Sequence, residues 1–146
     1  MTERFLMKET DPAAFKVMLA LEDYLETTSI SALHHEMIRI RASQINGCGY
    51  CINAHTQDAR KLGETEQRIY LLSVWREAPQ FTEEERVILA LTEEVTLIHQ
   101  QGLTAATYEK AVQHFGVKGT AELIMAVNTI NAWNRIGISS HRIPGK

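Results

Sequence analysis

One stretch is central to the interpretation of this chain: Cys48-Gly49-Tyr50-Cys51, followed one helical turn later by His55. It holds both cysteines of the sequence. An α-helix turns by about 100° per residue, so Cys48, Cys51 and His55 fall within a narrow sector of one helix face. Cα atoms three residues apart on a helix lie about 5–6 Å from each other, a separation that a disulfide tolerates. The pair can therefore cycle between dithiol and disulfide with little backbone movement.

Composition and length limit the class of protein. A chain of 146 residues is typical of one compact domain, and we expect a single domain over residues 1–146. The 15 basic and 18 acidic residues give a formal charge of -3 without long runs of one sign, so we expect neither nucleic acid nor a membrane as partner. The start, Met1-Thr2-Glu3-Arg4, resembles no leader peptide, and a cytoplasmic location is expected. In that reducing compartment, two cysteines at this spacing favour redox or metal chemistry.

Helical periodicity recurs along the chain and strand-like alternation is missing, so the predicted fold class is all-α. We expect a single-domain bundle of about seven helices followed by a tail from Ser139 to Lys146. The glycines and the capping residues set the boundaries. The predicted helices run from about Pro12 to Glu26, from Ser31 to Gly47, from the Cys48–Cys51 segment to Gly63, from Thr65 to Pro79, from Thr82 to Gly102, from Thr104 to Gly116, and from Thr120 to Arg135.

This arrangement places the cysteines at a helix N-terminus, where the thiol chemistry is favoured. The positive end of a helix dipole and a nearby imidazolium both lower the pKa of a thiol and increase the reactive thiolate fraction. Both influences are available to Cys51. Two other interpretations remain open: the cysteines are small buried residues, or Cys48, Cys51 and His55 belong to a zinc site whose fourth ligand has no obvious sequence signal. A thioredoxin fold is set aside because the βαβ pattern is absent.

The pattern Glu36-x11-Cys48-x2-Cys51-x3-His55 resembles the signature of the alkyl hydroperoxidase D family, within the larger carboxymuconolactone decarboxylase-like group. The resemblance implies an all-helical fold of the alkyl hydroperoxidase D type. Four further stretches resemble the short single-domain members of this family: Arg41 to Gly47, Gly63 to Thr65, Trp75 to Pro79 and Asn131 to Arg135.

The resemblance also implies roles for single residues. It makes Cys51 the peroxidatic thiol, Cys48 the resolving thiol, and Glu36 with His55 the proton relay. Attack on an O–O bond needs a thiolate, and a histidine with a carboxylate partner can deliver the proton that the departing alkoxide needs. The sequence departs from the best-studied type of the family at one position, since Tyr50 stands where that type has a histidine. A phenol ionises near pH 10 and cannot replace an imidazole as a shuttle at neutral pH.

Other polar and aromatic residues carry weaker signals. His34 and His35 directly precede Glu36, but adjacent residues on a helix point in different directions, so we expect both histidines at the surface or in packing contacts. Asp58 lies one turn beyond His55 and is either an orienting partner of that ring or, as we favour, an exposed carboxylate. Trp75 and Trp133 are expected in the core or in a subunit contact.

The sequence therefore predicts a thiol-dependent hydroperoxide reductase with peroxiredoxin-type antioxidant activity. We expect no metal, haem or flavin cofactor, and regeneration by a dithiol protein or a lipoyl-type reductant. Two alternatives are a carboxymuconolactone decarboxylase-like lyase, which would need no redox thiol pair, and a non-enzymatic redox-sensing interaction module. We also expect a homo-oligomer, a trimer or a hexamer, because the resembled family assembles in this way. The helix expected from Thr120 to Arg135 is also apolar around much of its surface, which suggests burial on more than one side. Burial of this helix within a monomer is the alternative.

Overall fold

The computed structural model describes residues 2–145, so Met1 and Lys146, the two ends of the expected domain, lie outside the described range. Over this range the chain is all-α, as the sequence predicts, and contains no strand. The elements are α1 (Met7–Thr10), α2 (Pro12–Glu26), α3 (Ala32–Asn46), α4 (Gly49–Lys61), α5 (Glu66–Leu71), a 3-10 helix η1 (Leu72–Val74), α6 (Glu83–Thr96), α7 (Ile98–Gln101) and α8 (Ala105–Ser139).

Capping residues start the helices where the sequence indicates. The side chain of Asp11 accepts a hydrogen bond from the amide of Ala14, and the Ser31 side chain accepts one from the amide of His34. Thr82 and Glu85 form a reciprocal capping box at the start of α6. At the end of α3, Gly47 adopts a left-handed conformation with a φ of 74°, which lets the chain turn at once into α4.

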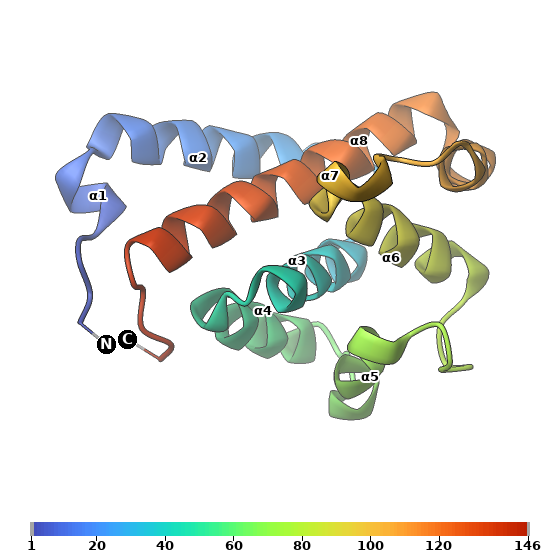
Figure 1. Ribbon diagram of the computed structural model, residues 1–146, viewed down its shortest axis with the longest axis horizontal. Coiled ribbons are helices and arrows are strands. Elements are labelled where there is room, and N and C mark those ends of the chain that lie inside the picture. The colour runs from blue at the N-terminus through green and yellow to red at the C-terminus, as the bar shows by residue number, and fades with distance from the viewer. Residues whose placement is uncertain (1, 146) are drawn as a thin grey trace.

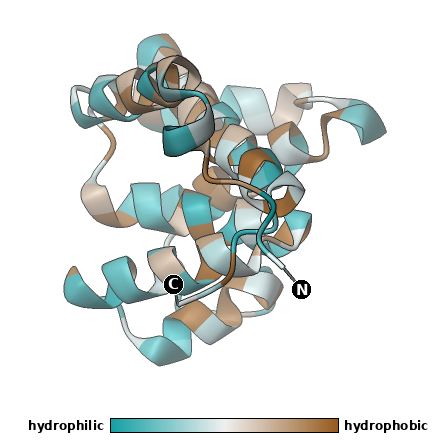
Figure 2. Ribbon diagram, turned by 90° about the vertical axis from the view of Figure 1, so that its left-hand side faces the viewer, coloured by the Kyte–Doolittle hydropathy of each residue, from teal (hydrophilic) through white to brown (hydrophobic). Residues whose placement is uncertain are grey.

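The helices pack around one main core between α3, α6 and α8. Figure 1 shows α2 lying alongside α8, while α3, α4 and α6 lie beneath them. Figure 2 shows hydrophobic turns toward the middle of the molecule and hydrophilic turns on its outward sides. The two ends of the described chain meet, since the amide of Arg4 donates to the carbonyl of Ser140 at 2.9 Å. The buried side chains of this core include Leu25, Ile38, Val87, Ile88, Leu91, Leu123, Val127 and Ile130.

Several predicted boundaries are wrong. The helix expected from Thr65 to Pro79 is shorter, because α5 tightens into η1 and ends at Val74. The helix expected to reach Gly102 ends at Thr96, and the separate short α7 follows it. The short α1 is an element that the sequence analysis did not predict. Element ends of this kind depend on tertiary packing more than on local sequence.

The last helix also differs from the prediction. Its expected break lies at Gly116, whose φ of 71° and ψ of 174° interrupt α8, but helix resumes directly afterwards and continues to Ser139. Within it, Leu123, Val127 and Ile130 are buried inside this one chain. Burial within the monomer thus accounts for much of the apolar surface that suggested an oligomer. The extension past Arg135 brings Gly137 close to Cys48 and Cys51.

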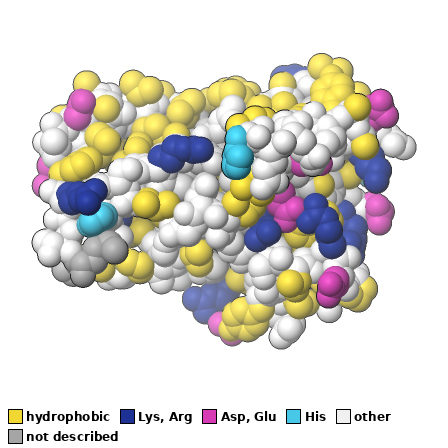
Figure 3. Space-filling model, in the orientation of Figure 1, with side chains coloured by type: hydrophobic (Ala, Val, Ile, Leu, Met, Phe, Trp, Pro, Cys, Tyr) yellow, Lys and Arg dark blue, Asp and Glu magenta, His cyan; other side chains and the backbone are white. Residues whose placement is uncertain are grey.

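The surface of α2 carries several apolar side chains. Val17, Leu19 and Tyr24 are exposed there, and Figure 3 shows hydrophobic side chains along this upper edge of the molecule. No helix between residues 2 and 145 combines the length with the apolar composition that crossing a bilayer would require.

A largely buried carboxylate, 12% exposed, joins α6 to the segment around Trp75. Glu93 accepts hydrogen bonds from Arg41 Nε at 2.9 Å, Trp75 Nε1 at 2.8 Å and Arg76 Nη1 at 2.5 Å. Burial alone would raise the pKa of Glu93, but the hydrogen bonds from Trp75, Arg76 and Arg41 outweigh it and hold this pKa below its ordinary value. The ionised carboxylate therefore stabilises the folded state.

Replacing Glu93 by glutamine tests this contribution. A depressed folded-state pKa adds stability that is present above the ordinary value of 4.5 and is lost as the pH falls through the folded-state pKa. We expect Glu93→Gln to lower the free energy of unfolding by about 1–3 kcal/mol at neutral pH, and by progressively less in acid. Urea denaturation across a pH series measures this difference. Glu84→Gln, on the exposed side of the same helix, is the control, and an equal loss from Glu93→Gln at every pH would contradict the assignment.

Candidate active site

The two cysteines form a disulfide at the first turn of α4. Cys48 is the N-cap residue, and its Sγ accepts a hydrogen bond from the amide of Cys51 at 3.4 Å. The Cα atoms of the bonded pair are 5.3 Å apart, within the range expected from their spacing on a helix. Cys48 is 1% exposed and Cys51 is 5% exposed, so the pair lies just beneath the surface. The dithiol therefore sits at a helix N-terminus, as predicted.

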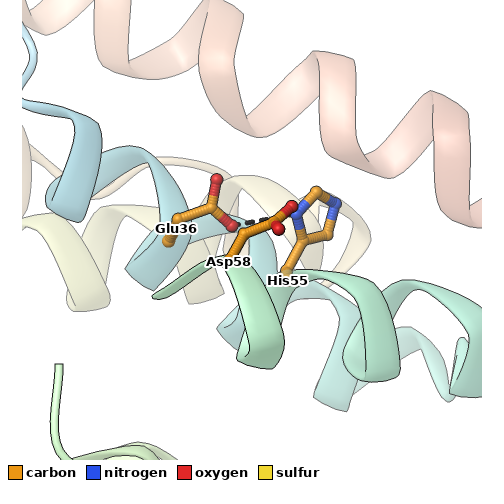
Figure 4. Close-up of side chains that lie close together, drawn as sticks. All are labelled: Glu36, His55 and Asp58. Carbon is orange, nitrogen blue, oxygen red and sulfur yellow. Dashed lines mark hydrogen bonds and ion pairs between the residues drawn. The ribbon is translucent and has the colours of Figure 1, made fainter. Parts of the chain in front are cut away.

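His55 and Glu36 come together from two helices. His55 lies one turn after Cys51 on α4, and its Nδ1 is 2.9 Å from Oε2 of Glu36 on α3. Figure 4 shows the two side chains pointing toward each other. The Glu36 side chain is only 6% exposed and that of His55 is 21% exposed, so the imidazole stands between the buried carboxylate and the outside. This pairing is the arrangement that a proton relay requires.

A cavity of about 630 Å³ opens beside these residues. Cys51 and His55 are part of its lining, whereas Cys48 and Glu36 are not. Its walls are largely apolar and come from the N-terminal segment, α2, α4 and α8. Charged residues from the N-terminal segment, α2, α3 and the C-terminal tail also line it. The apolar lining residues include Leu6, Met7, Phe15, Leu19, Ala54, Trp133 and Ile136, and the charged ones are Lys8, Glu22, Glu26, Arg39 and Arg142.

Buried amides fix the end of α3 against α8 and thereby position the cysteines. Asn46 donates from Nδ2 to Oδ1 of Asn131 at 3.0 Å and to Oδ1 of Asn134 at 2.9 Å. Asn134 in turn donates to Oγ of Ser43 at 2.9 Å. Because buried amides are costly unless they are paired, this cluster specifies how α3 and α8 meet. It gives a structural role to the stretches Arg41 to Gly47 and Asn131 to Arg135.

Comparison with known proteins places this site in a family. The sequence pattern of the carboxymuconolactone decarboxylase family matches residues 12–94, more than half of the chain, and that range includes Glu36, Cys48, Cys51 and His55. The chain belongs to this family. An uncharacterized family relative, YdfG of Bacillus subtilis (strain 168), is 41% identical over 139 residues, which are 95% of each chain.

Solved structures show that the chain has an alkyl hydroperoxidase D-like fold. A protein of unknown function from Agrobacterium tumefaciens, proposed there as an antioxidant defence protein AhpD, has a TM-score of 0.95 and 34% identity over 99% of both chains. An uncharacterized peroxidase-related protein from Ralstonia eutropha JMP134, described as an alkylhydroperoxidase AhpD core, has a TM-score of 0.84 and 20% identity. That match covers 97% of this chain and 75% of the other, and it shows a shared fold.

This member of the carboxymuconolactone decarboxylase family anchors Tyr50 to its own C-terminal tail. The guanidinium carbon of Arg142 lies 4.6 Å from the centre of the Tyr50 ring, and Nη1 of Arg142 is 2.5 Å from Oε1 of Glu3. The pKa of Arg142 is raised above its ordinary value, because hydrogen bonds with Tyr50 and Glu3 outweigh the opposing effect of burial. Tyr50 thus contacts the C-terminal tail through Arg142, which in turn pairs with Glu3 near the N-terminus.

Among the remaining sequence candidates, His34, His35 and Trp75 lie outside the cavity lining, whereas Trp133 is part of it. His35 is buried, with Nε2 3.2 Å from Oγ1 of Thr28, and burial is the main reason that its pKa lies below the ordinary value. His34 is half-buried. Trp75 is buried in a second hydrophobic cluster, which includes Met37 and Leu72, and it lies next to Glu93. Trp133, which was expected in the core or in a subunit contact, forms part of the cavity wall instead.

Asp58 lies beside His55 and Glu36, and these three residues each offer a ligand atom within 4.8 Å of the others (Figure 4). Cations already pair with both carboxylates, because Lys61 lies 2.9 Å from Asp58 and Arg39 lies 2.5 Å from Glu36. The Asp58 side chain is 49% exposed. The group is therefore best described as a network of ion pairs at the edge of the site.

Sequence reasoning missed the contributions of Arg39, Glu22 and Gly137. Arg39 follows Glu36 by three residues on the same helix, a spacing that predicts an ion pair. The Glu22 contact spans two helices and has no local signal. Gly137 lies inside α8, where glycine is unfavourable, and a Cβ built there would lie 3.3 Å from Sγ of Cys48 and 3.7 Å from Sγ of Cys51. Its missing side chain lets α8 approach the disulfide closely.

Gly137→Ala tests this close approach. An alanine normally stabilises a helix interior by about 1 kcal/mol relative to glycine. Here the added methyl group presses on a buried sulfur, and we expect the free energy of unfolding of the disulfide form to fall by about 1–3 kcal/mol. Urea denaturation measures the change, with Ser139→Ala on an exposed position of the same helix as control. An increase in stability would show that the disulfide leaves room for the methyl group.

Proposed function

We propose that this protein is a thiol-dependent hydroperoxide reductase in which Cys51 attacks the peroxide and Cys48 resolves the product. The observation that carries the proposal is where the four residues lie relative to the cavity. Cys51 and His55 line the cavity, Cys48 lies behind Cys51 within disulfide distance, and Glu36 pairs with the far side of the imidazole. The family resemblance to alkyl hydroperoxidase D-like proteins supports the same chemistry.

The cycle balances with the groups present and an external dithiol. The Cys51 thiolate attacks one oxygen of ROOH, the O–O bond breaks, and the departing alkoxide takes a proton from His55 to leave as ROH. This leaves Cys51 as a sulfenic acid. The Cys48 sulfur then attacks the Cys51 sulfur and the S–O bond breaks; the proton given up by the Cys48 thiol joins the departing hydroxide, which leaves as water as the disulfide forms. A dithiol protein or lipoyl-type reductant restores both thiols by exchange and becomes a disulfide itself.

Turnover under different reductants tests the proposal. The reduced protein is mixed with an organic hydroperoxide, and peroxide loss is followed with dithiothreitol, dihydrolipoamide or a thioredoxin-type protein as electron source. We expect catalytic peroxide loss with at least one dithiol and none with a monothiol at the same thiol concentration. If the disulfide forms but peroxide consumption never exceeds one equivalent per chain, the protein is a redox-sensing module and not a peroxidase. Decarboxylation of a lactone acid without peroxide turnover would indicate the lyase.

Single cysteine variants assign the two thiol roles. Cys51→Ser should abolish peroxide reduction, whereas Cys48→Ser should react once and keep Cys51 as a sulfenic acid or a mixed disulfide. Mass spectrometry after one equivalent of peroxide locates the added oxygen, with dimedone as the trap for sulfenic acid. Oxygen found on Cys48 in Cys51→Ser, with Cys51 inert in Cys48→Ser, would reverse the assignment.

Variants of the proton relay test its shared role. Glu36→Gln and His55→Gln should each slow peroxide reduction by about 10–1,000-fold while the protein stays folded. Because groups that act as a unit contribute non-additively, the double variant should be little slower than the slower single variant. Initial rates at saturating dithiol give the three values. A double variant whose loss equals the product of the two single losses would show two independent contributions.

We also propose that the protein assembles as a homo-oligomer, a trimer or a hexamer. Its support is the family resemblance and the exposed apolar side chains of Val17, Leu19 and Tyr24 on α2. Light scattering over a concentration series should give a mass several times the 16.5 kDa of one chain. A constant mass of a single chain would exclude the oligomer.

A further inference from the structure

We infer that Arg39 is a positioning residue that holds the Glu36 carboxylate in the orientation needed by His55, and that Glu22 and Trp133 hold Arg39. The catalytic consequence of this inference rests on the proposed peroxidase function. Its structural consequence, a fixed tautomer of His55, does not.

The contacts form one continuous chain across four helices. Nη1 of Arg39 lies 2.5 Å from Oε1 of Glu36, while Oε2 of the same carboxylate lies 2.9 Å from Nδ1 of His55. The other branch of the guanidinium, Nη2, lies 2.7 Å from Oε2 of Glu22. Oε1 of Glu22 accepts a hydrogen bond from Nε1 of Trp133 at 2.9 Å. Each oxygen of both carboxylates therefore has its own partner, which leaves neither group free to rotate.

This geometry fixes where the His55 proton lies. An ionised carboxylate can only accept, so Nδ1 of His55 donates to Glu36 and Nε2 remains as the nitrogen that can exchange a proton with a reacting atom. Without Arg39, Oε1 of the buried Glu36 would lose its partner, and the carboxylate could turn or bind a proton instead. The His55 ring would then lose its fixed acceptor.

The same chain of contacts ties the relay to the cavity wall. Trp133, Glu22, Arg39 and His55 all line the cavity. The Trp133 ring packs edge-on against Phe15, with ring centres 5.9 Å apart and planes at 70°. A structural ion pair that merely fastens α2 to α3 would leave the protonation pattern of His55 unchanged when it is removed, so that pattern distinguishes the two roles.

The test compares Arg39→Met with Arg41→Met. Both arginines lie on α3 and pair with a glutamate, and their side chains are 19% and 16% exposed, but Arg41 is not part of the cavity lining. Imidazole ¹⁵N NMR of the reduced protein reports which His55 nitrogen carries the proton. We expect Nδ1–H in the wild type and in Arg41→Met, and a mixture of tautomers in Arg39→Met. A wild-type His55 pattern in Arg39→Met would overturn the inference, as would an equal change in Arg41→Met.

Kinetics provide the second readout. Arg39→Met should slow oxidation of Cys51 by an organic hydroperoxide by about 10-fold or more, with little change in the half-saturating concentration of peroxide. When Glu36 is already replaced by glutamine, adding Arg39→Met should slow Cys51 oxidation by a further factor of less than about 2, because Arg39 acts through Glu36. A double variant whose loss of rate equals the product of the two single-variant losses would contradict a positioning role.

Milder variants keep the inference testable if Arg39→Met does not fold. Arg39→Lys keeps the charge but cannot bridge two carboxylates with a planar fork, and Trp133→Phe keeps the aromatic wall but removes the Nε1 donor. We expect Arg39→Lys to shift the His55 tautomer and Trp133→Phe to shift it less. Wild-type His55 spectra in both would overturn the inference. A tautomer that depends on Arg39 in a protein without peroxide turnover would uphold the positioning role and reject the proposed function.

Discussion

The buried carboxylate of Glu36 is the constraint on which the site depends. A carboxylate that is only 6% exposed is unfavourable unless its charge is paired and its oxygens are hydrogen-bonded. Glu36 meets this condition with Arg39 on one oxygen and His55 on the other. The pairing fixes how α4 lies against α3, and it thereby sets the direction of the imidazole that follows Cys51 by one turn. The same interaction that makes the carboxylate tolerable also builds a proton relay.

The helices around this pair hold Cys51 at the wall of an apolar cavity, with Cys48 bonded to it outside the lining. Asn46 and Asn134 lock the end of α3 to α8, and Gly137 lets α8 approach the disulfide without a side chain between them. The reactive groups therefore sit on helices and not on loops, which favours precise geometry. The cavity walls come from segments distant in sequence, including the N-terminal segment that is bound to the end of α8.

The sequence predicts the local features of this site and misses the distant ones. The left-handed Gly47, the opening of α4 within the Cys48–Cys51 segment and the shared face of Cys51 and His55 follow from capping and helical spacing, which depend on neighbouring residues alone. The contact of Glu22 with Arg39 and the place of Trp133 in the cavity wall depend on how α2 and α8 pack, and no local pattern encodes that packing. The continuation of α8 beyond Arg135 was missed for the same reason, because its last turns are held by contacts with Arg4 and Arg142.

The most direct test of the account is the stoichiometry of a single turnover. Fully reduced protein receives less than one equivalent of cumene hydroperoxide without any added reductant, and the remaining thiols and the alcohol product are counted at intervals. The account predicts that each peroxide reduced consumes two thiols of one chain and yields one alcohol, far faster than free cysteine reacts. Thiol loss at the rate of free cysteine, or a disulfide that forms without an equal amount of alcohol, would contradict it.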